Sequence, residues 1–157
     1  MNWNRLLALG LEAGTKAPEF ELLDQDMKLH KLTDHLGSKV LIFFYPQDLS
    51  PGCTAQACSF RDHNESYKAR GIKVFGINTN SIQSHKKFAE KHKINYPLLA
   101  DQDKAVARKY EVLLPIGIAN RISFLINAHG FIEDKFSWLP WKNYAKSLET
   151  RFTPSKK

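Results

Sequence analysis

Residues 39–79, KVLIFFYPQDLSPGCTAQACSFRDHNESYKARGIKVFGINT, decide the fold of this chain. The stretch opens with an unbroken run of apolar, β-branched and aromatic residues at 39–45, which is typical of a strand buried on both faces. Residues 54–70 predict a helix that ends at Gly71, and 72–79 is a second run of the buried-strand type. Strand, helix and strand in this order predict a βαβ unit of an α/β fold.

The flanking sequence continues this alternation. Residues 81–93 predict a helix capped by Ser81, with apolar or weakly polar residues on one face: Ile82, His85, Phe88, Ala89 and His92. The other expected elements are an outer strand at 17–24, a short helix at 101–112, a hairpin of strands 121–127 and 130–136, and a final helix at 141–152. This order predicts a three-layer α/β domain. No repeat, low-complexity segment or Gly/Ser linker interrupts the sequence, so residues 1–157 are expected to form a single domain.

The composition is that of an ordinary globular protein. Of 157 residues, 43% are hydrophobic and 25% are charged, which gives the chain a real core. The start MNWNRLLALGLEAG has one arginine and an apolar run that Glu12 soon interrupts. The single positive charge and short apolar run make a weak signal peptide, and the run is too short to span a membrane. We therefore expect a cytoplasmic protein, in which the two cysteines stay reduced at rest and any disulfide is transient.

The chain is basic, with 23 basic and 16 acidic residues, a net charge of +7, and much of the excess at 84–93 and 154–157. Such a charge attracts nucleic acid or anionic surfaces. A solvated helix face and an exposed tail are the favoured explanation, because charge runs usually belong to exposed surface and no aromatic-interleaved basic motif or zinc-finger spacing accompanies this one. We expect neither nucleic acid nor a membrane among the partners.

A cysteine stands where the first strand of the βαβ unit passes into the helix. Ser50 and Pro51 predict a helix start, with the serine as cap and the proline at the first helical position, so Cys53 lies in the first turn. Unpaired backbone N–H groups and the positive end of the helix dipole stabilise the thiolate there, which is the nucleophilic form of cysteine. In α/β folds, ligands also bind at the carboxyl ends of the strands, which is where Cys53 lies. Cys53 is the candidate nucleophile, and a buried structural cysteine is the alternative.

The other cysteine, Cys58, follows five residues later in the same predicted helix. In an intact helix five residues rise about 7.5 Å and turn through about 500°, which places the Cα atoms beyond the roughly 7 Å limit for a disulfide. Cys58 is therefore either a core residue or the partner of Cys53 in a disulfide that forms after the first turns unwind. A zinc site on the cysteine pair lacks histidines at matching spacing.

Residues 43–62, FFYPQDLSPGCTAQACSFRD, resemble the active-site segment of the peroxiredoxins, in which a proline, a Thr or Ser and a cysteine have the spacing of Pro46, Ser50 and Cys53. The subgroup called peroxiredoxin Q or bacterioferritin comigratory protein is similar in its second cysteine and in the segments SHKKFAEKH (84–92), YPLLAD (96–101) and RISFLIN (121–127). The resemblance implies a thioredoxin-like fold with a central mixed sheet. It also implies peroxidase activity on hydrogen peroxide and organic hydroperoxides, and recycling by thioredoxin or a similar dithiol without a cofactor.

The same resemblance assigns a role to each candidate residue. Cys53 corresponds to the peroxidatic cysteine and Cys58 to the resolving cysteine. Ser50 replaces the more common threonine, whose methyl group would hold the hydroxyl more firmly against thiolate and peroxide. Pro46 shields the thiolate from water, and Arg121 holds the thiolate and a peroxide oxygen. Because the implied disulfide is intramolecular, the expected enzyme is a monomer.

Two other classes of function explain part of the sequence. A general disulfide oxidoreductase shares the fold, but it is expected to carry C-x-x-C, whereas this chain has C-x₄-C. A non-enzymatic binding protein would use the basic helix or exposed apolar residues, and its binding would not depend on Cys53. Neither class accounts for the proline, serine, cysteine and arginine together.

Overall fold

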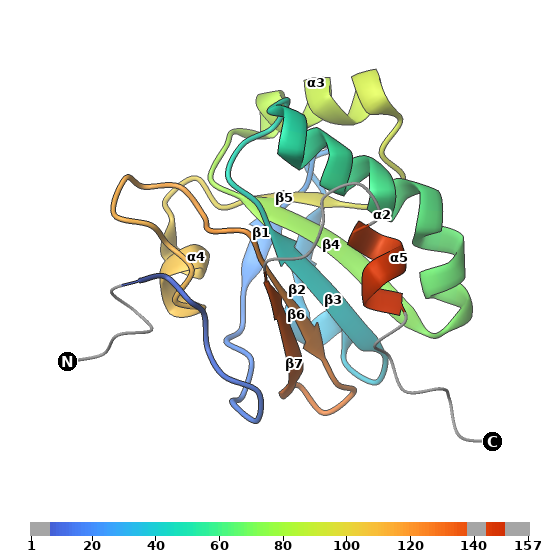
Figure 1. The fold of residues 1–157 in the computed structure, drawn as a ribbon, viewed down its shortest axis with the longest axis vertical. Helices are drawn as coiled ribbons and strands as arrows, with labels where there is room; N and C mark the ends of the chain where they lie inside the picture. The colour runs from blue at the N-terminus through green and yellow to red at the C-terminus, as the bar shows by residue number, and fades with distance from the viewer. Residues whose placement is uncertain (1–6, 138–143, 150–157) are drawn as a thin grey trace.

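The computed structural model describes residues 7–137 and 144–149. Its centre is a five-stranded sheet in the order β5-β4-β3-β6-β7. Three neighbouring strands pair in parallel: β3 (Lys39–Phe44), β4 (Ile72–Asn78) and β5 (Leu98–Ala100). β6 (Ile122–Ile126) pairs antiparallel with β3, and β7 (Ile132–Ser137) pairs antiparallel with β6 (Figure 1). The sheet is therefore mixed, as the resemblance implied.

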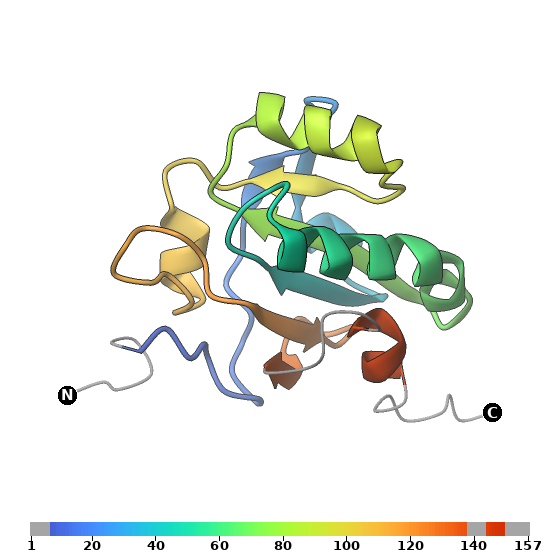
Figure 2. The ribbon, with the colours of Figure 1, turned by 45° about the horizontal axis from the view of Figure 1, so that its top comes forward.

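Two layers cover this sheet. One face carries the helices α2 (Pro51–Ala69), α3 (Ile82–His92) and α5 (Tyr144–Glu149), which lie together in Figures 1 and 2. The other face carries the hairpin of β1 (Glu21–Leu23) and β2 (Leu29–Lys31), the short 3-10 helix η1 (Leu32–His35) and α4 (Ala105–Lys109). This is the predicted three-layer α/β arrangement.

The β3–α2–β4 unit confirms the prediction made from residues 39–79. β3 and β4 pair in parallel along their length. α2 begins at Pro51, which the sequence assigned to the first helical position. Beyond its end Gly71 has a φ of 75°, a left-handed conformation that glycine adopts at no steric cost.

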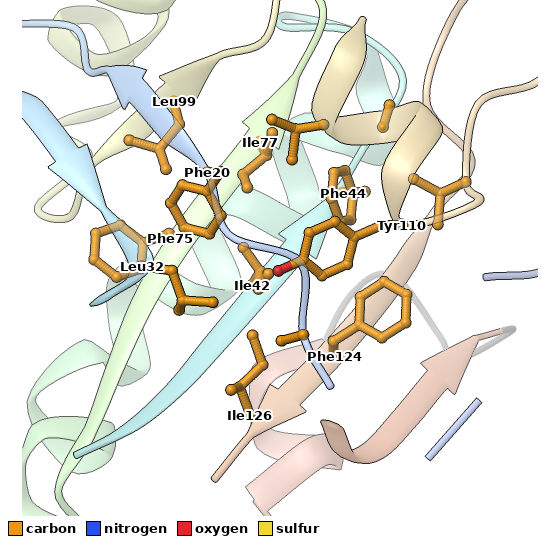
Figure 3. Packing of buried hydrophobic residues seen from close by; sticks show 14 of the residues in the cluster. Phe20, Leu32, Ile42, Phe44, Phe75, Ile77, Leu99, Tyr110, Phe124 and Ile126 are labelled. Carbon is orange, nitrogen blue, oxygen red and sulfur yellow. The ribbon is translucent and has the colours of Figure 1, made fainter. Parts of the chain in front are cut away.

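β3 is buried on both faces, as its unbroken apolar run predicts. Every second side chain from Val40 to Phe44 joins the cluster beneath the β1–β2 hairpin and α4, part of which Figure 3 shows. The alternate side chains, from Leu41 to Tyr45, join a second cluster beneath the helical layer. Cys53 belongs to this second cluster, so the candidate nucleophile lies in the helix-side core.

α3 confirms the predicted helix and its cap, because Ser81 Oγ accepts a hydrogen bond from Ser84 N at 3.1 Å. On its inner face Phe88 and Ala89 are buried as expected. His85 is fully buried as well, but it is more than the weakly polar residue of an apolar face that the sequence pattern indicated. Both of its ring nitrogens form hydrogen bonds.

The outer strand expected at 17–24 is shorter in the structure, where only Glu21–Leu23 is a strand. It pairs with β2, which was not predicted, in a separate two-stranded sheet. Pro18 offers no N–H group to a strand ladder. At the other end the Asp24 carboxylate accepts hydrogen bonds from two backbone N–H groups of the following turn, which redirects the chain.

The helix expected at 101–112 is also shorter. Lys104 (φ 66°) and Glu111 (φ 59°) adopt left-handed conformations, which interrupt a right-handed helix on both sides of α4. The Asp101 carboxylate accepts hydrogen bonds from two N–H groups at the start of α4 and so fixes where the helix begins.

The remaining elements complete the sheet and its cover. β5 was missed as a strand, since three residues are too few to show a period, and it pairs in parallel with the end of β4. The β6–β7 hairpin is confirmed. α5 confirms the final helix, although both ends of the predicted span 141–152 lie outside the described residues. Among the helices described, none is long and apolar enough to cross a membrane.

Candidate active site

α2 begins beyond the carboxyl ends of the parallel strands β3 and β4 (Figure 1), and Cys53 is its third residue. It belongs to the first turn of α2 and is fully buried. That turn contains no acidic residue, so the positive end of the helix has no competing carboxylate of its own. The predicted position of Cys53 is confirmed.

Ser50 occupies the N-cap position of α2 with an extended backbone, at φ −72° and ψ 149°. Its side chain does not cap the helix, which corrects the expectation from the sequence. The hydroxyl instead donates to the carbonyl oxygen of Gln47 at 3.3 Å, because the chain turns back just before α2. The backbone carbonyl of Ser50 accepts a hydrogen bond from Thr54 N at 2.8 Å, but the N–H groups of Gly52 and Cys53 donate none to the Ser50 side chain and remain able to face an anion.

Arg121 immediately precedes β6, which pairs antiparallel with β3. An antiparallel strand begins where its neighbour ends, so Arg121 lies at the same end of the sheet as Pro46. Pro46 is partly buried and follows β3. Arg121 Nη1 donates a hydrogen bond to Gln56 Oε1 at 2.7 Å. Gln56 is fully buried on α2, one turn after Cys53, so the arginine is held against the helix that carries the nucleophile.

Gln56 was not among the predicted site residues. Its signal in the sequence was its position three residues beyond Cys53, which places both on one helix face. Within the described residues, Gln56 Nε2 is buried and has no hydrogen-bond partner. The guanidinium of Arg121 only donates, so the amide oxygen must face it and the Nε2 donor stays unpaired. A buried donor of this kind suits a ligand that offers an oxygen atom.

Cys58 is half-buried and lies farther along the unbroken α2, and both cysteines are free thiols. Burial raises the pKa of the Cys58 thiol, Arg61 opposes this rise, and Asp62 adds to it. Cys58 is therefore a neutral thiol in this conformation, and the structure does not bring it to Cys53. Across the described residues, no three His, Cys, Asp or Glu side chains are grouped to hold a metal ion.

Residues 13–135 match the AhpC/TSA family. The chain belongs to this family. It is 40% identical over 141 residues to peroxiredoxin Bcp of Escherichia coli K12, with 85% of this chain and 90% of the relative covered. It is 35% identical over 150 residues to the chloroplastic peroxiredoxin Q of Oryza sativa subsp. japonica, with 93% of this chain and 69% of the relative covered.

A solved structure supports the same assignment. The crystal structure of peroxidoxin BcpB from Mycobacterium tuberculosis has a TM-score of 0.80 at 31% identity, with 87% of this chain and 93% of that chain covered. These likenesses confirm the thioredoxin-like peroxiredoxin fold and the resemblance seen in residues 43–62. The chain is thus a peroxiredoxin, an enzyme of the thiol peroxidase class.

Proposed function

We propose that this peroxiredoxin reduces hydrogen peroxide and organic hydroperoxides at Cys53 and regenerates itself through a disulfide with Cys58. The observation that carries the proposal is a buried cysteine in the first turn of α2, with Arg121 held beside that helix by Gln56. A helix start and a guanidinium both favour negative charge. The reaction requires such charge twice, on the attacking thiolate and on the departing peroxide oxygen.

In the first step the Cys53 thiolate attacks the nearer oxygen of the peroxide. An S–O bond forms as the O–O bond breaks, so the sulfur is oxidised to a sulfenic acid and the peroxide is reduced. The departing oxygen takes the electron pair of the broken bond and then a proton, and it leaves as water or an alcohol. Arg121 and the first-turn N–H groups of α2 stabilise its charge.

Ser50 and Pro46 complete the site. The Ser50 proton is directed to Gln47, so the Ser50 oxygen is left to accept a hydrogen bond from the peroxide O–H. Pro46 has no N–H group to attract water, and it shields the thiolate on the side of β3.

In the second step the first turns of α2 unwind and Cys58 attacks the sulfur of the Cys53 sulfenic acid. An S–S bond forms, the S–O bond breaks, and the oxygen leaves as water. Unwinding exposes Cys58 and removes the burial that raises the pKa of its thiol in the helix. An external dithiol of the thioredoxin type then reduces the disulfide by exchange. One chain supplies both cysteines, so the proposed enzyme is a monomer, with the cytoplasm as its setting.

Mass spectrometry after an equimolar addition of hydrogen peroxide tests this proposal. The expected product has lost two hydrogen atoms, and peptide mapping with thiol trapping places a disulfide between Cys53 and Cys58. It should form before further oxidation of Cys53 can compete. Two thiols that react slowly and stay unlinked would contradict the proposal and return both cysteines to the core.

The disulfide step should accelerate when the first turns of α2 are loosened by Ala55→Gly. Ala55 lies between the two cysteines and is partly exposed, so the change removes no core side chain. Glycine in a helix interior costs about 1 kcal/mol relative to alanine, which enriches the unwound state about fivefold. Rapid quenching by alkylation should show the disulfide forming faster by the same factor, with the preceding oxidation of Cys53 unchanged.

Glu65→Gly is the matched control for this change. Glu65 is exposed on the same helix but lies beyond Cys58, so glycine there weakens the helix without freeing the segment between the cysteines. Its disulfide should form at the parent rate. Equal acceleration in both variants, or in neither, would show that opening of the first turns does not control this step.

A further inference from the structure

The segment between β3 and α2, residues 45–50, is anchored by the side chain of Asp48. This carboxylate is 1% exposed, although it belongs to a loop. Its Oδ1 accepts hydrogen bonds from Tyr45 Oη at 2.6 Å and from Asn78 Nδ2 at 3.3 Å. The backbone N–H of Asp48 also donates to Asn80 Oδ1 at 2.8 Å. The ends of β3 and β4 thus both hold the loop that leads to the nucleophile.

The second carboxylate oxygen, Asp48 Oδ2, meets the first turn of α3. It accepts hydrogen bonds from Ser84 Oγ and His85 Nδ1, each at 2.7 Å. The other ring nitrogen, His85 Nε2, lies 3.0 Å from the carbonyl oxygen of Leu99. Both ring nitrogens face acceptors, so both carry a proton. His85 is therefore an imidazolium that forms a buried ion pair with Asp48.

The protonation states around this pair are consistent with that reading. Burial by itself would raise the pKa of Asp48, but the hydrogen bond and charge of His85, with the two hydroxyl donors, outweigh burial and lower it. Burial, the charge and hydrogen bond of Asp48, and the nearby Cys53 raise the pKa of Tyr45, so its phenol stays protonated and donates to Asp48. The ion pair has no net charge, and it therefore holds the loop without placing an unbalanced carboxylate near the thiol.

The loop held in this way contains a strained residue. Leu49 has a φ of 67°, a left-handed conformation that costs energy for a side chain with a Cβ atom. Its side chain is 48% exposed, so its own packing does not impose this conformation. The constraint comes from its neighbours, because Asp48 is fixed on one side and Pro51 begins α2 on the other.

We propose that the Asp48–His85 ion pair positions Cys53 for its reaction with peroxide by fixing the loop that precedes α2. The inference rests on the proposed role of Cys53 as the peroxidatic residue. Asp48 and His85 are positioning residues, which act through the backbone that leads to Cys53. When one of them is replaced, the other is left as a buried charge without its partner, and Leu49 is released from its strained conformation. Cys53 and the first-turn N–H groups then lose their alignment.

The test compares Asp48→Asn and His85→Gln with the parent chain. Rapid quenching with a sulfenic-acid trap measures the second-order rate of Cys53 oxidation by hydrogen peroxide, and thermal unfolding gives the melting temperature. We expect both variants to react about 10- to 100-fold more slowly, the effect of a small misplacement of reacting groups. Ser84→Ala removes one hydrogen bond and keeps the ion pair, so it should fold and show a smaller loss of rate.

The Asp24–His30 pair provides the control. It joins the same two side-chain types at 2.8 Å, with 7% and 8% exposure, but it belongs to the β1–β2 hairpin on the other face of the sheet. Asp24→Asn and His30→Gln should lower the melting temperature in a similar way and leave the oxidation rate within about twofold of the parent. If the Asp48 and Ser84 variants keep the parent rate, or slow no more than the Asp24 variants, the pair is only structural and the proposal fails. If Cys53 of the parent chain is not oxidised, the proposed peroxidase function itself fails, and this inference with it.

Discussion

Cys53→Ser is expected to lose at least about a thousandfold of the peroxidase turnover, because it removes the nucleophile on which every later step depends. A serine hydroxyl does not ionise at neutral pH, even at a helix start, and it forms no sulfenic acid. The helix start and Arg121 remain in this variant, but they stabilise charge and cannot replace the attacking sulfur. An assay that couples peroxide consumption to oxidation of a dithiol measures the loss.

Cys58→Ser is the matched control, since it removes the other thiol of the same helix. Cys58 is half-buried, and serine occupies its place without a clash. This variant should consume one equivalent of peroxide at the parent rate and then stop, with Cys53 held as a sulfenic acid that dimedone traps. Recycling by the dithiol should stall. Equal loss of the first oxidation in both variants would contradict the assignment of peroxidatic and resolving roles.

The central unit of the fold was predictable because its signals are local. The apolar runs of β3 and β4 are long enough to identify buried strands, and Ser50, Pro51 and Gly71 mark the ends of the helix between them. The position of Cys53 followed from the same signals. The three-residue strands β2 and β5 carry no such pattern, since their pairing is decided by neighbours in space.

The residues that support the site were not predictable, because each depends on a partner far away in the chain. Gln56 and Arg121 are 65 positions apart, and nothing local shows that they meet. Asp48 and His85 are 37 positions apart. In the sequence, a histidine on the same helix face as Phe88 and Ala89 is interpreted as a weakly polar residue of the buried face. Only its two acceptors in the folded chain identify it as a charged one.

The position of Ser50 was predictable from the sequence, but its hydrogen bond was not, even though the partner is a near neighbour in the chain. Its place at the start of α2 follows from the sequence, because a hydroxyl residue before proline favours the N-cap position. The direction of its hydroxyl does not follow, since the turn before α2 offers the carbonyl oxygen of Gln47 as a competing acceptor. Position along the chain was therefore more predictable than hydrogen bonding.

Arg121→Met is expected to slow the oxidation of Cys53 by hydrogen peroxide about 100- to 1,000-fold, the usual cost of removing a preorganised donor to a developing oxyanion. Methionine keeps much of the length of arginine but has neither charge nor N–H groups. The Gln56 carbonyl loses its donor in this variant, so some stability should be lost as well. Arg121→Lys restores the charge without the planar fork and should recover part of the rate.

Two reactions of the same thiol separate the ways in which Arg121 can act. Alkylation by iodoacetamide reports the thiolate content of Cys53, because iodide departs and no charge develops on an oxygen. Peroxide reports the thiolate and the departing oxygen together, so Arg121→Met should slow oxidation at least about tenfold more than alkylation. Arg70→Met is the control, because Arg70 pairs with Glu149 at 3.2 Å near the other end of α2. Equal falls in both reactions would limit Arg121 to stabilising the thiolate, and unchanged rates would remove it from the site.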